Sequence, residues 1–329
     1  MLVDKKKDIR SITVLVTGGA GFIGSNLCRA LLHDTSHIYH VICLDNFYCS
    51  SPENIAELRE HPRFRFIHMD VNKCSVEEIS TTQSVTHIDE IYHLACPASP
   101  PIYQKDPIHT INTNFIGTRN VLELARHYDA SVLLASTSEV YGDPSIPEQD
   151  ESYWGYVNSY GPRSCYDEGK RIAETLFLEY KNIHDVDTRI VRIFNTYGPY
   201  MNKDDGRVVS NLINQALENK PITLYGDGMQ TRSFCYVSDL VSGLMKLMNS
   251  GYNDPVNLGN PNEMTIRDLA SLILQLTESS SPLSFYELPR DDPKRRKPVI
   301  SRAQILLDWS PVVSIEEGLC HTIQYYSGL

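Results

Sequence analysis

The sequence lacks the patterns that mark several common classes of protein. Its 329 residues contain no C-x-x-C and no H-E-x-x-H spacing, so we predict neither a zinc or redox motif nor any other protein-held metal. No apolar run approaches the ~20 residues that a membrane-spanning helix needs. Positive charge is also scarce, because 41 acidic residues outnumber 30 basic ones and the formal net charge is -11. Such a balance repels a phosphate backbone, so we expect no nucleic-acid binding. The lack of a long apolar run leads us to expect no membrane partner either.

Eight cysteines are scattered along the chain, and nothing else in the sequence is typical of a secreted protein. Residues 1–10 are charged and contain no apolar segment like that of a signal peptide. We therefore interpret the thiols as free and expect a cytoplasmic protein. The composition, with 41% hydrophobic and 22% charged residues, is that of a globular chain long enough for two packed subdomains.

Short apolar runs alternate with helical patterns in the first half of the chain. Strands are expected near residues 12–16, 41–44, 64–67, 88–94, 132–135 and 188–194, with helices near 22–32, 54–59, 112–126 and 160–180. This alternation predicts a Rossmann-type, doubly wound parallel sheet in an α/β fold. The second half has more turn signals, with helices expected near 207–218, 238–248, 266–276 and 315–326. We predict a Rossmann domain of residues 9–195 plus about 235–262, and a smaller C-terminal α/β substrate domain of residues 196–234 plus 263–329.

A glycine-rich turn follows the first predicted strand and opens the first predicted helix. Gly18, Gly21 and Gly24 recur at three-residue steps, and Phe22 and Ile23 begin the helix. Glycine permits a tight turn and lets a pyrophosphate approach the backbone, while the helix N-terminus supplies free N–H groups and a positive dipole end. A simple strand-to-helix turn is the alternative, but the strand–turn–helix context favours a dinucleotide site.

Two acidic residues follow the next strands of this predicted sheet. Asp45, with Asn46 after it, ends the second strand about 20 residues beyond the last motif glycine, where a carboxylate grips the ribose hydroxyls of a dinucleotide. A carboxylate there repels a 2′-phosphate, which favours NAD over NADP. Asp70 and Val71 follow the third strand and are expected near the adenine, although Asp after a strand is also a common turn residue.

A cluster of reactive residues is predicted from two further segments. Tyr166 and Lys170 are four positions apart on a predicted helix, so their side chains share one face. Free tyrosine has a pKa near ~10, but a neighbouring ammonium and a cationic nicotinamide both favour its phenolate. This pair suits removal of a proton from a sugar hydroxyl, although a surface i,i+4 pair is the more frequent explanation of Y-x-x-x-K. Thr137, Ser138 and Glu139 follow the fifth strand, where a doubly wound sheet places its ligands.

These residues carry a family resemblance over nearly the whole chain. The sequence resembles the nucleotide-sugar-modifying members of the extended short-chain dehydrogenase/reductase family, and among them the enzymes that decarboxylate UDP-glucuronate. The segments that carry the resemblance are residues 93–100, 137–139, 161–166 with Lys170, 192–199, 205–211, 231–234 and 296–298. The resemblance implies conversion of UDP-glucuronate to UDP-xylose by C4 oxidation with NAD, loss of CO2 from the 4-keto sugar, and re-reduction at C4.

The resemblance also implies a role for individual residues. Tyr166 is expected to deprotonate the C4 hydroxyl with help from Thr137 and Lys170, and Glu139 with a bound water to manage protonation at C5. Further cofactor contacts are implied for Leu94, Ala95, Thr196 and Arg207. Substrate contacts are implied for Pro97, Asn195, Val209, Tyr225, Arg232 and Arg296. The basic run at residues 294–297 can also be read as a solvated loop or a nuclear-localisation-like patch.

The residue at position 138 distinguishes decarboxylation from the related 4,6-dehydration. Related 4,6-dehydratases carry Asp between the Thr and the Glu, as an acid that expels the C6 hydroxyl. Ser138 is far too weak an acid for that step and adds no negative charge beside a substrate carboxylate, so it favours decarboxylation. Two positions depart from the family pattern, because Asn112 stands where Lys is usual and Tyr200 where Arg is usual.

Three alternatives to decarboxylation stay open on the sequence. A nucleotide-sugar 4,6-dehydratase of the dTDP-glucose type and a 4-epimerase use the same scaffold, and a regulatory NAD-binding protein needs no turnover. By analogy with similar enzymes, the predicted helices at 112–126 and 160–180 are expected to form the interface of a homodimer.

Overall fold

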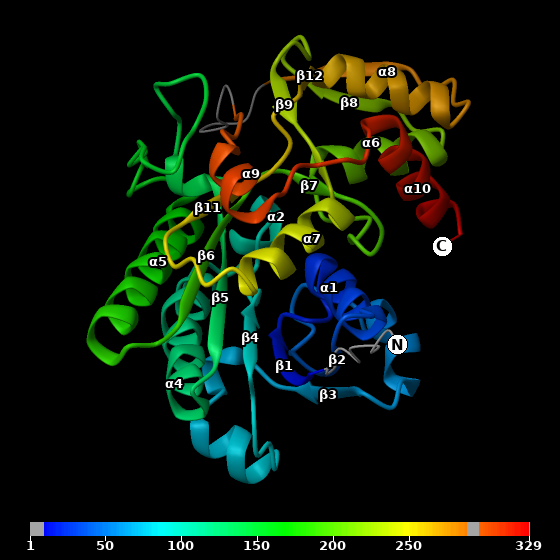
Figure 1. The fold of residues 1–329 in the computed structure, drawn as a ribbon. Helices are drawn as coiled ribbons and strands as arrows, with labels where there is room; N and C mark the ends of the chain where they lie inside the picture. Colours follow the sequence, from blue (N-terminus) through cyan, green and yellow to red (C-terminus); the bar gives the residue numbers. More distant parts are fainter. Residues whose placement is uncertain (1–9, 288–295, 329) are drawn as a thin grey trace, which may run out of the picture.

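A seven-stranded parallel sheet forms the centre of the molecule in the computed structural model, which describes residues 10–287 and 296–328 (Figure 1). The strands are β1 (Ser11–Thr17), β2 (Ile38–Asp45), β3 (Phe64–His68), β4 (Glu90–His93), β5 (Ser131–Thr137), β6 (Thr188–Ile193) and β11 (Val256–Leu258). Their order is β3-β2-β1-β4-β5-β6-β11, so the direction of winding reverses between β1 and β4. A doubly wound sheet leaves a ligand crevice at the carboxyl ends of the strands where this reversal occurs.

Helices cover both faces of the sheet, because its strands are apolar on both. Val14 and Val16 of β1 lie in one buried cluster with α1 (Phe22–His33) and α7 (Val237–Met248). Leu15 between them lies in a second cluster with α4 (Thr118–Tyr128) and α5 (Ser164–His184). Figure 1 shows α4 and α5 together on one side of the sheet and α1 and α7 on the other. Burial of successive residues on opposite faces is the pattern of a parallel sheet covered by helices.

The core of the sheet also contains a segment from far along the chain. Helix α9 (Ser301–Leu307) and Trp309 are buried in the same cluster as α7. The indole Nε1 of Trp309 donates a hydrogen bond to the Asp239 carbonyl at 2.9 Å. A Cβ on Gly243 of α7 would lie 3.0 Å from that same nitrogen, so the indole packs directly on the helix backbone. The chain therefore returns to the sheet after it has passed through a second region.

That second region has a smaller core of its own, at the top of Figure 1. Leu212, Leu224, Leu269 and Leu319 are fully buried there. Its elements are β7 (Thr196–Tyr197), α6 (Val208–Leu217), β8 (Ile222–Tyr225), β9 (Thr231–Ser233), β10 (Cys235–Tyr236), β12 (Glu263–Thr265), α8 (Ile266–Leu276), β13 (Leu283–Tyr286) and α10 (Ile315–Ser327). The strands pair two by two, β7 with β10, β9 with β12 and β8 with β13.

Short helical turns connect the larger elements near the sheet. They are η1 (Pro52–Ile55), η2 (Glu57–Glu60), η3 (Val71–Lys73), η4 (Glu78–Thr82), α2 (Pro100–Tyr103), α3 (Pro107–Asn112), η5 (Thr113–Gly117) and η6 (Ser138–Tyr141). Within the described residues, no helix combines the length and the apolar composition needed to cross a membrane.

The predicted parallel sheet is confirmed, and two predicted helices need correction. Helix α5 begins at Ser164 rather than near residue 160, because residues 161–163 form a turn in which the Ser164 N–H donates to the Gly161 carbonyl at 3.1 Å. The helix expected at residues 54–59 is a pair of four-residue 3-10 turns, η1 and η2, and Pro52 occupies the first position of η1.

Candidate active site

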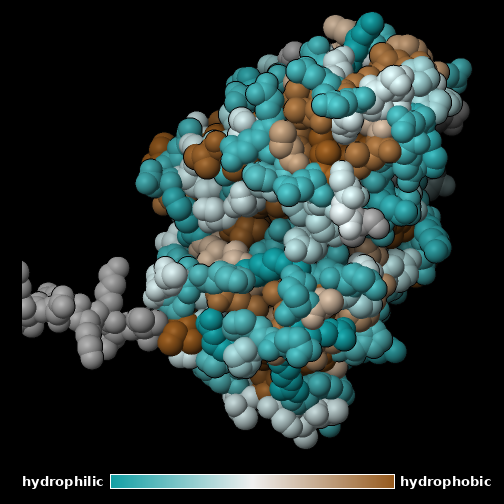
Figure 2. All heavy atoms as spheres, turned by 90° about the vertical axis from the view of Figure 1, so that its right-hand side faces the viewer, coloured by the Kyte–Doolittle hydropathy of each residue, from teal (hydrophilic) through white to brown (hydrophobic). Residues whose placement is uncertain are grey.

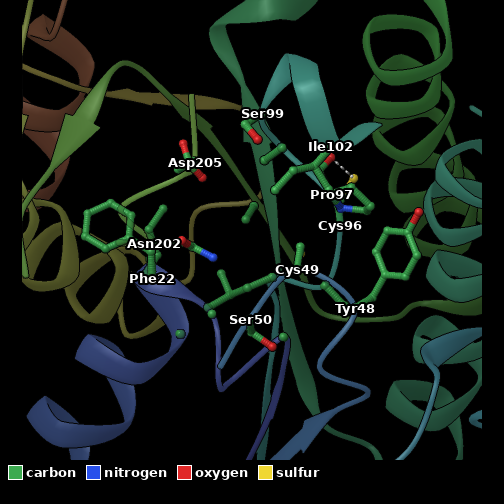
Figure 3. Close-up of a pocket in the computed structure, with 18 of the residues that line it drawn as sticks. Phe22, Tyr48, Cys49, Ser50, Cys96, Pro97, Ser99, Ile102, Asn202 and Asp205 are labelled. Carbon is green, nitrogen blue, oxygen red and sulfur yellow. Dashed lines mark hydrogen bonds between the residues drawn. The ribbon is translucent and has the colours of Figure 1, made fainter. Parts of the chain in front are cut away.

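A cavity of about 450 Å³ opens at the carboxyl ends of the central strands. Figure 3 shows Phe22 of α1, Cys96 and Pro97 after β4, and Asn202 and Asp205 from the second region around this space. The cavity also collects most of the residues that the sequence indicated. Those lining it are Gly18, Gly21, Phe22, Ile23, Asp45, Asn46, Asp70, Val71, Leu94, Ala95, Pro97, Thr137, Ser138, Glu139, Tyr166, Lys170, Asn195, Thr196 and Arg207.

Four of the predicted residues lie outside this lining. Val209 is buried in α6, and Tyr225, at the end of β8, is 43% exposed. Arg232 lies in β9 and donates to the carbonyl of the preceding residue at 2.8 Å. Arg296 reaches the site indirectly, by contacting two residues of the lining. Asn112 is not among the lining residues either, and residues 294 and 295 of the basic run lie outside the described residues.

The glycine turn has the geometry of a phosphate cradle. Gly18 has φ +72°, and a Cβ on it would lie 2.8 Å from the backbone nitrogen of Ala95. A Cβ on Gly24 would lie 2.2 Å from the Gly18 carbonyl oxygen, so helix α1 packs tightly on the turn. Helix α1 starts after Gly21 with no side-chain cap, which leaves N–H groups of its first turn for a ligand. These features fit the pyrophosphate of a dinucleotide.

Asp45 lies at the end of β2 beside this cradle, and its side chain is buried. Its Oδ2 accepts from the Ala20 N–H at 3.0 Å, and its Oδ1 accepts from the Phe47 N–H at 2.8 Å and the Ser50 hydroxyl at 2.7 Å. Asp70, which also lines the cavity, caps η3 with its carboxylate. The carboxylate of Asp45 is thus held rigidly, where it can accept from ribose hydroxyls and repel a 2′-phosphate.

Tyr166 and Lys170 project from the first two turns of α5 on the same side. The Lys170 Nζ lies 6.0 Å from the centre of the Tyr166 ring and donates to the Ala135 carbonyl at 2.9 Å. The Tyr166 ring stacks on Tyr103 with a centroid distance of 5.1 Å and an interplanar angle of 4°. The base candidate is therefore fixed by packing on one face and by the helix that carries it.

The pKa of Tyr166 is raised above its ordinary value, contrary to the direction that the sequence suggested. Burial is the largest cause, and the nearby Cys96 thiol and Glu139 carboxylate raise it further. Hydrogen bonding by Thr137 and the positive charge of Arg207 lower the pKa but do not compensate. The phenol is therefore protonated in the cofactor-free site, and its ionisation depends on positive charge that a bound ligand brings.

Glu139, which also lines the cavity, forms ion pairs with two arginines. Its backbone N–H donates to the Thr137 hydroxyl at 3.2 Å, which fixes the short turn η6 after β5. The Arg163 Nη2 donates to its Oε1 at 2.8 Å, and both terminal nitrogens of Arg296 donate to its two oxygens. The Ser138 hydroxyl, at 3.5 Å from Arg296 Nη1, completes this group.

Two arginines keep Glu139 ionised although it is buried. Burial alone raises the pKa of this carboxyl, but the charges of Arg296 and Arg163 outweigh burial and hold the pKa well below its usual value. The sequence motif containing Arg163 was recognised, but nothing in the sequence indicated that its side chain turns toward Glu139. The arrangement presents a neutralised carboxylate to the cavity rather than a free negative charge.

His93, behind the site at the end of β4, was not predicted as a functional residue. Its ring nitrogens lie 2.8 Å from the Thr17 hydroxyl and 3.1 Å from the Thr118 hydroxyl. Burial and then the charge of Lys170 lower its pKa to about 3, so it is neutral. Its place at the start of the segment 93–100, which carries the resemblance, is the sequence signal that could have found it.

The assembled site can bind a dinucleotide, remove a proton from an alcohol with a phenol, and hold an anionic group near two arginines. No group of three or more potential metal-ligating side chains occurs in the part of the chain that the structure describes. These capacities match redox chemistry on a sugar alcohol.

Comparisons with known proteins agree with this description. The family model described as "NAD dependent epimerase/dehydratase family" matches residues 14–259. UDP-glucuronic acid decarboxylase 1 of Danio rerio is 52% identical over 95% of this chain and 72% of its own length. UDP-glucuronic acid decarboxylase 6 of Arabidopsis thaliana is 50% identical over 94% of this chain and 87% of its own. Among solved structures, UDP-glucuronic acid 4-epimerase from Bacillus cereus, in complex with UDP-glucuronic acid and NAD, aligns with a TM-score of 0.85 at 32% identity, over 96% of this chain and 99% of that one.

Proposed function

This chain belongs to the NAD-dependent epimerase/dehydratase family, and from that membership we propose that it converts UDP-glucuronate to UDP-xylose with NAD as a retained cofactor. The observation that carries the choice of reaction is the pairing of neutral Ser138 with a Glu139 whose charge is balanced by Arg163 and Arg296. A site built in this way tolerates a substrate carboxylate. Relatives at 50–52% identity are decarboxylases, whereas the aligned epimerase is 32% identical.

The cofactor would lie along the carboxyl edge of the sheet. The glycine turn with Phe22 and Ile23 would hold the pyrophosphate, Asp45 and Asn46 the adenosine ribose, and residues 70–71 and 94–95 would flank the adenine and the central part of the dinucleotide. Thr196 and Arg207 would lie toward its nicotinamide end. When bound, NAD supplies the hydride acceptor for the sugar C4 and returns the hydride to the same carbon.

Tyr166 would remove the proton of the C4 hydroxyl, and Thr137 would hold that hydroxyl toward the phenol oxygen. Because burial raises the pKa of Tyr166, the base forms only when positive charge arrives beside it. Lys170, anchored on the Ala135 carbonyl, would then stabilise the phenolate and could donate to a cofactor hydroxyl. The proton is thus taken up in the loaded site and retained there for the return step.

Loss of CO2 follows from the substrate's own chemistry, because the C4 ketone is β to the carboxylate on C5. The bond between C5 and the carboxylate carbon breaks, and its electron pair forms an enolate with the C4 ketone. Ser138 places no charge beside the departing carboxylate. Glu139 is ionised, so its role at C5 would be to accept from and orient a water that delivers the proton and takes a proton back from solvent, rather than to donate one itself. Arg296 would hold Glu139 in place and extend positive charge toward the substrate.

The rest of the substrate would be held by residues from the second region. Asn195 and Pro97 line the cavity, and Arg232, in β9, would reach the diphosphate. Val209 and Tyr225 are proposed to contact the uridine, because they lie on α6 and at the end of β8 in that region.

We also propose the division of the chain that the sequence suggested. Residues 9–195 with about 235–262 would form the NAD-binding domain, and residues 196–234 with 263–329 the nucleotide-sugar-binding domain. Helix α9 and Trp309 are the exception within the second set, because they pack in the core of the sheet.

A cytoplasmic homodimer is the proposed working form. Apolar side chains are exposed on α5, which packs on the sheet, and on α3 and η5, which pack against α5; they are Ile108, Ile111, Phe115, Ile172 and Leu178. Pairing these helices with those of a second copy would cover them. The described structure contains eight free cysteines and no disulfide, in keeping with a reducing compartment.

Proton NMR of the purified protein with UDP-glucuronate and NAD tests the reaction. UDP-xylose without net NADH is the expected result. Formation of UDP-galacturonate would make the protein a 4-epimerase, and a 4-keto-6-deoxy sugar from dTDP-glucose would make it a dehydratase. NAD binding with no turnover of either substrate would favour a regulatory NAD-binding protein.

A further inference from the structure

The loop of residues 199–203, between β7 and α6, borders the same cavity as the glycine turn. Tyr200, Asn202 and Lys203 line the cavity, and Figure 3 shows Asn202 on the same side of it as Phe22. This loop belongs to the second region, whereas the turn belongs to the sheet. Any connection between them spans the edge of the dinucleotide site.

Two asparagine side chains make that connection. The Asn54 Nδ2 donates to the Ala20 carbonyl at 2.9 Å and to the Tyr200 carbonyl at 3.1 Å. The Asn26 Nδ2 donates to the Phe22 carbonyl at 2.8 Å and to the Pro199 carbonyl at 3.0 Å. Each amide thus joins one carbonyl of the phosphate cradle to one carbonyl of the loop, so the two segments move together or the bonds break.

Two further side chains contact the Tyr200 ring and strengthen the same connection. The Arg29 guanidinium of α1 lies 3.6 Å from its centroid, and the Tyr325 ring of α10 lies 4.9 Å away at 50°. Arg29 is itself fixed by Glu57 and by the Asn54 carbonyl, to which it donates at 2.6 Å. Cations over tyrosine faces are attracted by the ring quadrupole.

The backbone at Tyr200 is also held in an uncommon conformation. Its φ is +69°, a left-handed value that bulky residues rarely adopt and that persists only when the surroundings hold it. Arg29 and Tyr325 contact the ring of this residue, and Asn54 donates to its carbonyl, so these contacts hold the conformation in place.

We propose that these contacts form a clasp that sets how long the dinucleotide stays bound. The clasp consists of Asn26, Arg29, Asn54, Tyr200 and Tyr325, and it has to open before a cofactor seated between the cradle and the loop leaves. The consequence for the reaction rests on the proposed function. A redox-neutral cycle reaches its product only if the cofactor reduced in the first step is still bound for the last one.

The first test measures cofactor release without substrate. Bound NADH is displaced by excess NAD in a stopped-flow experiment that follows NADH fluorescence. Tyr200→Asn removes the ring, while asparagine tolerates a left-handed φ, so the backbone is kept. This variant is expected to release NADH about tenfold faster, and Tyr200→Phe, which keeps both ring contacts, within twofold of the unmodified protein. Equal release from Tyr200→Asn and the unmodified protein would overturn the clasp.

A second variant tests the clasp independently, in case Tyr200→Asn does not fold. Arg29→Met keeps the aliphatic stem but removes the guanidinium, and it is expected to raise the NADH release rate severalfold with an unchanged circular dichroism spectrum. The NADH release rates are measured without a sugar substrate. They therefore test the clasp even if the protein does not decarboxylate UDP-glucuronate.

The last measurement tests the link to the reaction. With UDP-glucuronate, Tyr200→Asn is expected to release a larger share of UDP-4-keto-pentose relative to UDP-xylose, as seen by proton NMR. Faster NADH release with an unchanged product ratio would overturn the role of the clasp in completing the cycle.

Discussion

The two terminal nitrogens of Arg296 donate to the two carboxylate oxygens of Glu139, across 157 positions of sequence. Arg163 donates to the same carboxylate from the turn before α5. The single charge of Glu139 thus offsets part of the charge of two guanidinium groups at the wall of the cavity, and its removal leaves buried Arg296 without its carboxylate partner.

Replacing Glu139 by glutamine tests that balance. Glu139→Gln is expected to lower kcat at least ~100-fold, because buried Arg296 loses its carboxylate partner and the water at C5 loses its acceptor. UDP-xylose formation measures the rate, and NADH fluorescence is expected to show cofactor affinity within about threefold. Glu148→Gln is the matched control, because Glu148 forms an ion pair with Lys297 at the surface and is 50% exposed. Glu139→Gln with more than half of the original rate would refute the assigned role.

Tyr166→Phe is expected to abolish turnover while NADH still binds, because the ring and its stack on Tyr103 remain but the proton acceptor is lost. Initial rates and fluorescence titration give the two readouts. Tyr160→Phe, at a position that is 98% exposed, serves as the control and is expected to be fully active. Full activity of Tyr166→Phe would mean that another group is the base.

Ser138 tests the distinction between decarboxylation and dehydration. Ser138→Asp places a second negative charge beside the substrate carboxylate, and at a few ångströms that repulsion is worth about 3–4 kcal/mol, or a loss of more than ~100-fold in kcat/KM. Ser138→Ala adds no charge and is expected to stay within about tenfold. Steady-state kinetics with UDP-glucuronate measure both, and equal rates for the two variants would rule out the electrostatic explanation.

Glu90 makes the stability of the fold dependent on pH. It lies buried in β4, at the far end of the sheet from the site, and burial and then the charge of Asp89 raise its pKa to about 7. Because the folded pKa lies above the ordinary value of 4.5, the group contributes stability below about pH 4.5 that is lost as the pH rises through 7.

Glu90→Gln removes this dependence. Relative to the unmodified protein, its free energy of unfolding is expected to gain up to about 3 kcal/mol between pH 5 and pH 8, from a shift of 1.4 kcal/mol per pKa unit. Urea unfolding followed by circular dichroism at several pH values measures the difference. Glu77→Gln, at an exposed position, is the control with no expected change. A difference that stays constant with pH would contradict the raised pKa.

Local patterns in the sequence were enough to predict the sheet and the cofactor cradle. Strand β1 and the glycine turn are adjacent in the chain, so their geometry follows from a few neighbouring residues, and the alternation of apolar runs with helices fixed the winding. The same holds for Tyr166 and Lys170, whose four-residue spacing on one helix sets their common direction.

Contacts between distant segments were not predictable. The approach of Arg163 and Arg296 to Glu139, the stack of Tyr103 on Tyr166 and the clasp around Tyr200 each depend on how separate elements pack. No periodicity encodes such pairings. The direction of the Tyr166 pKa shift was missed for the same reason, because burial is a property of the assembled core.

The position of Trp309 has a consequence for the order in which the chain folds. Helix α9 and this indole complete one side of the sheet only after most of the second region, from β7 to β13, has been synthesised. A ribosome-bound chain that ends before residue 309 therefore exposes apolar surface on α7 and leaves the first core unfinished. Contacts of such long sequence separation slow folding, so the nascent first half depends on protection from aggregation until the last tenth of the chain emerges.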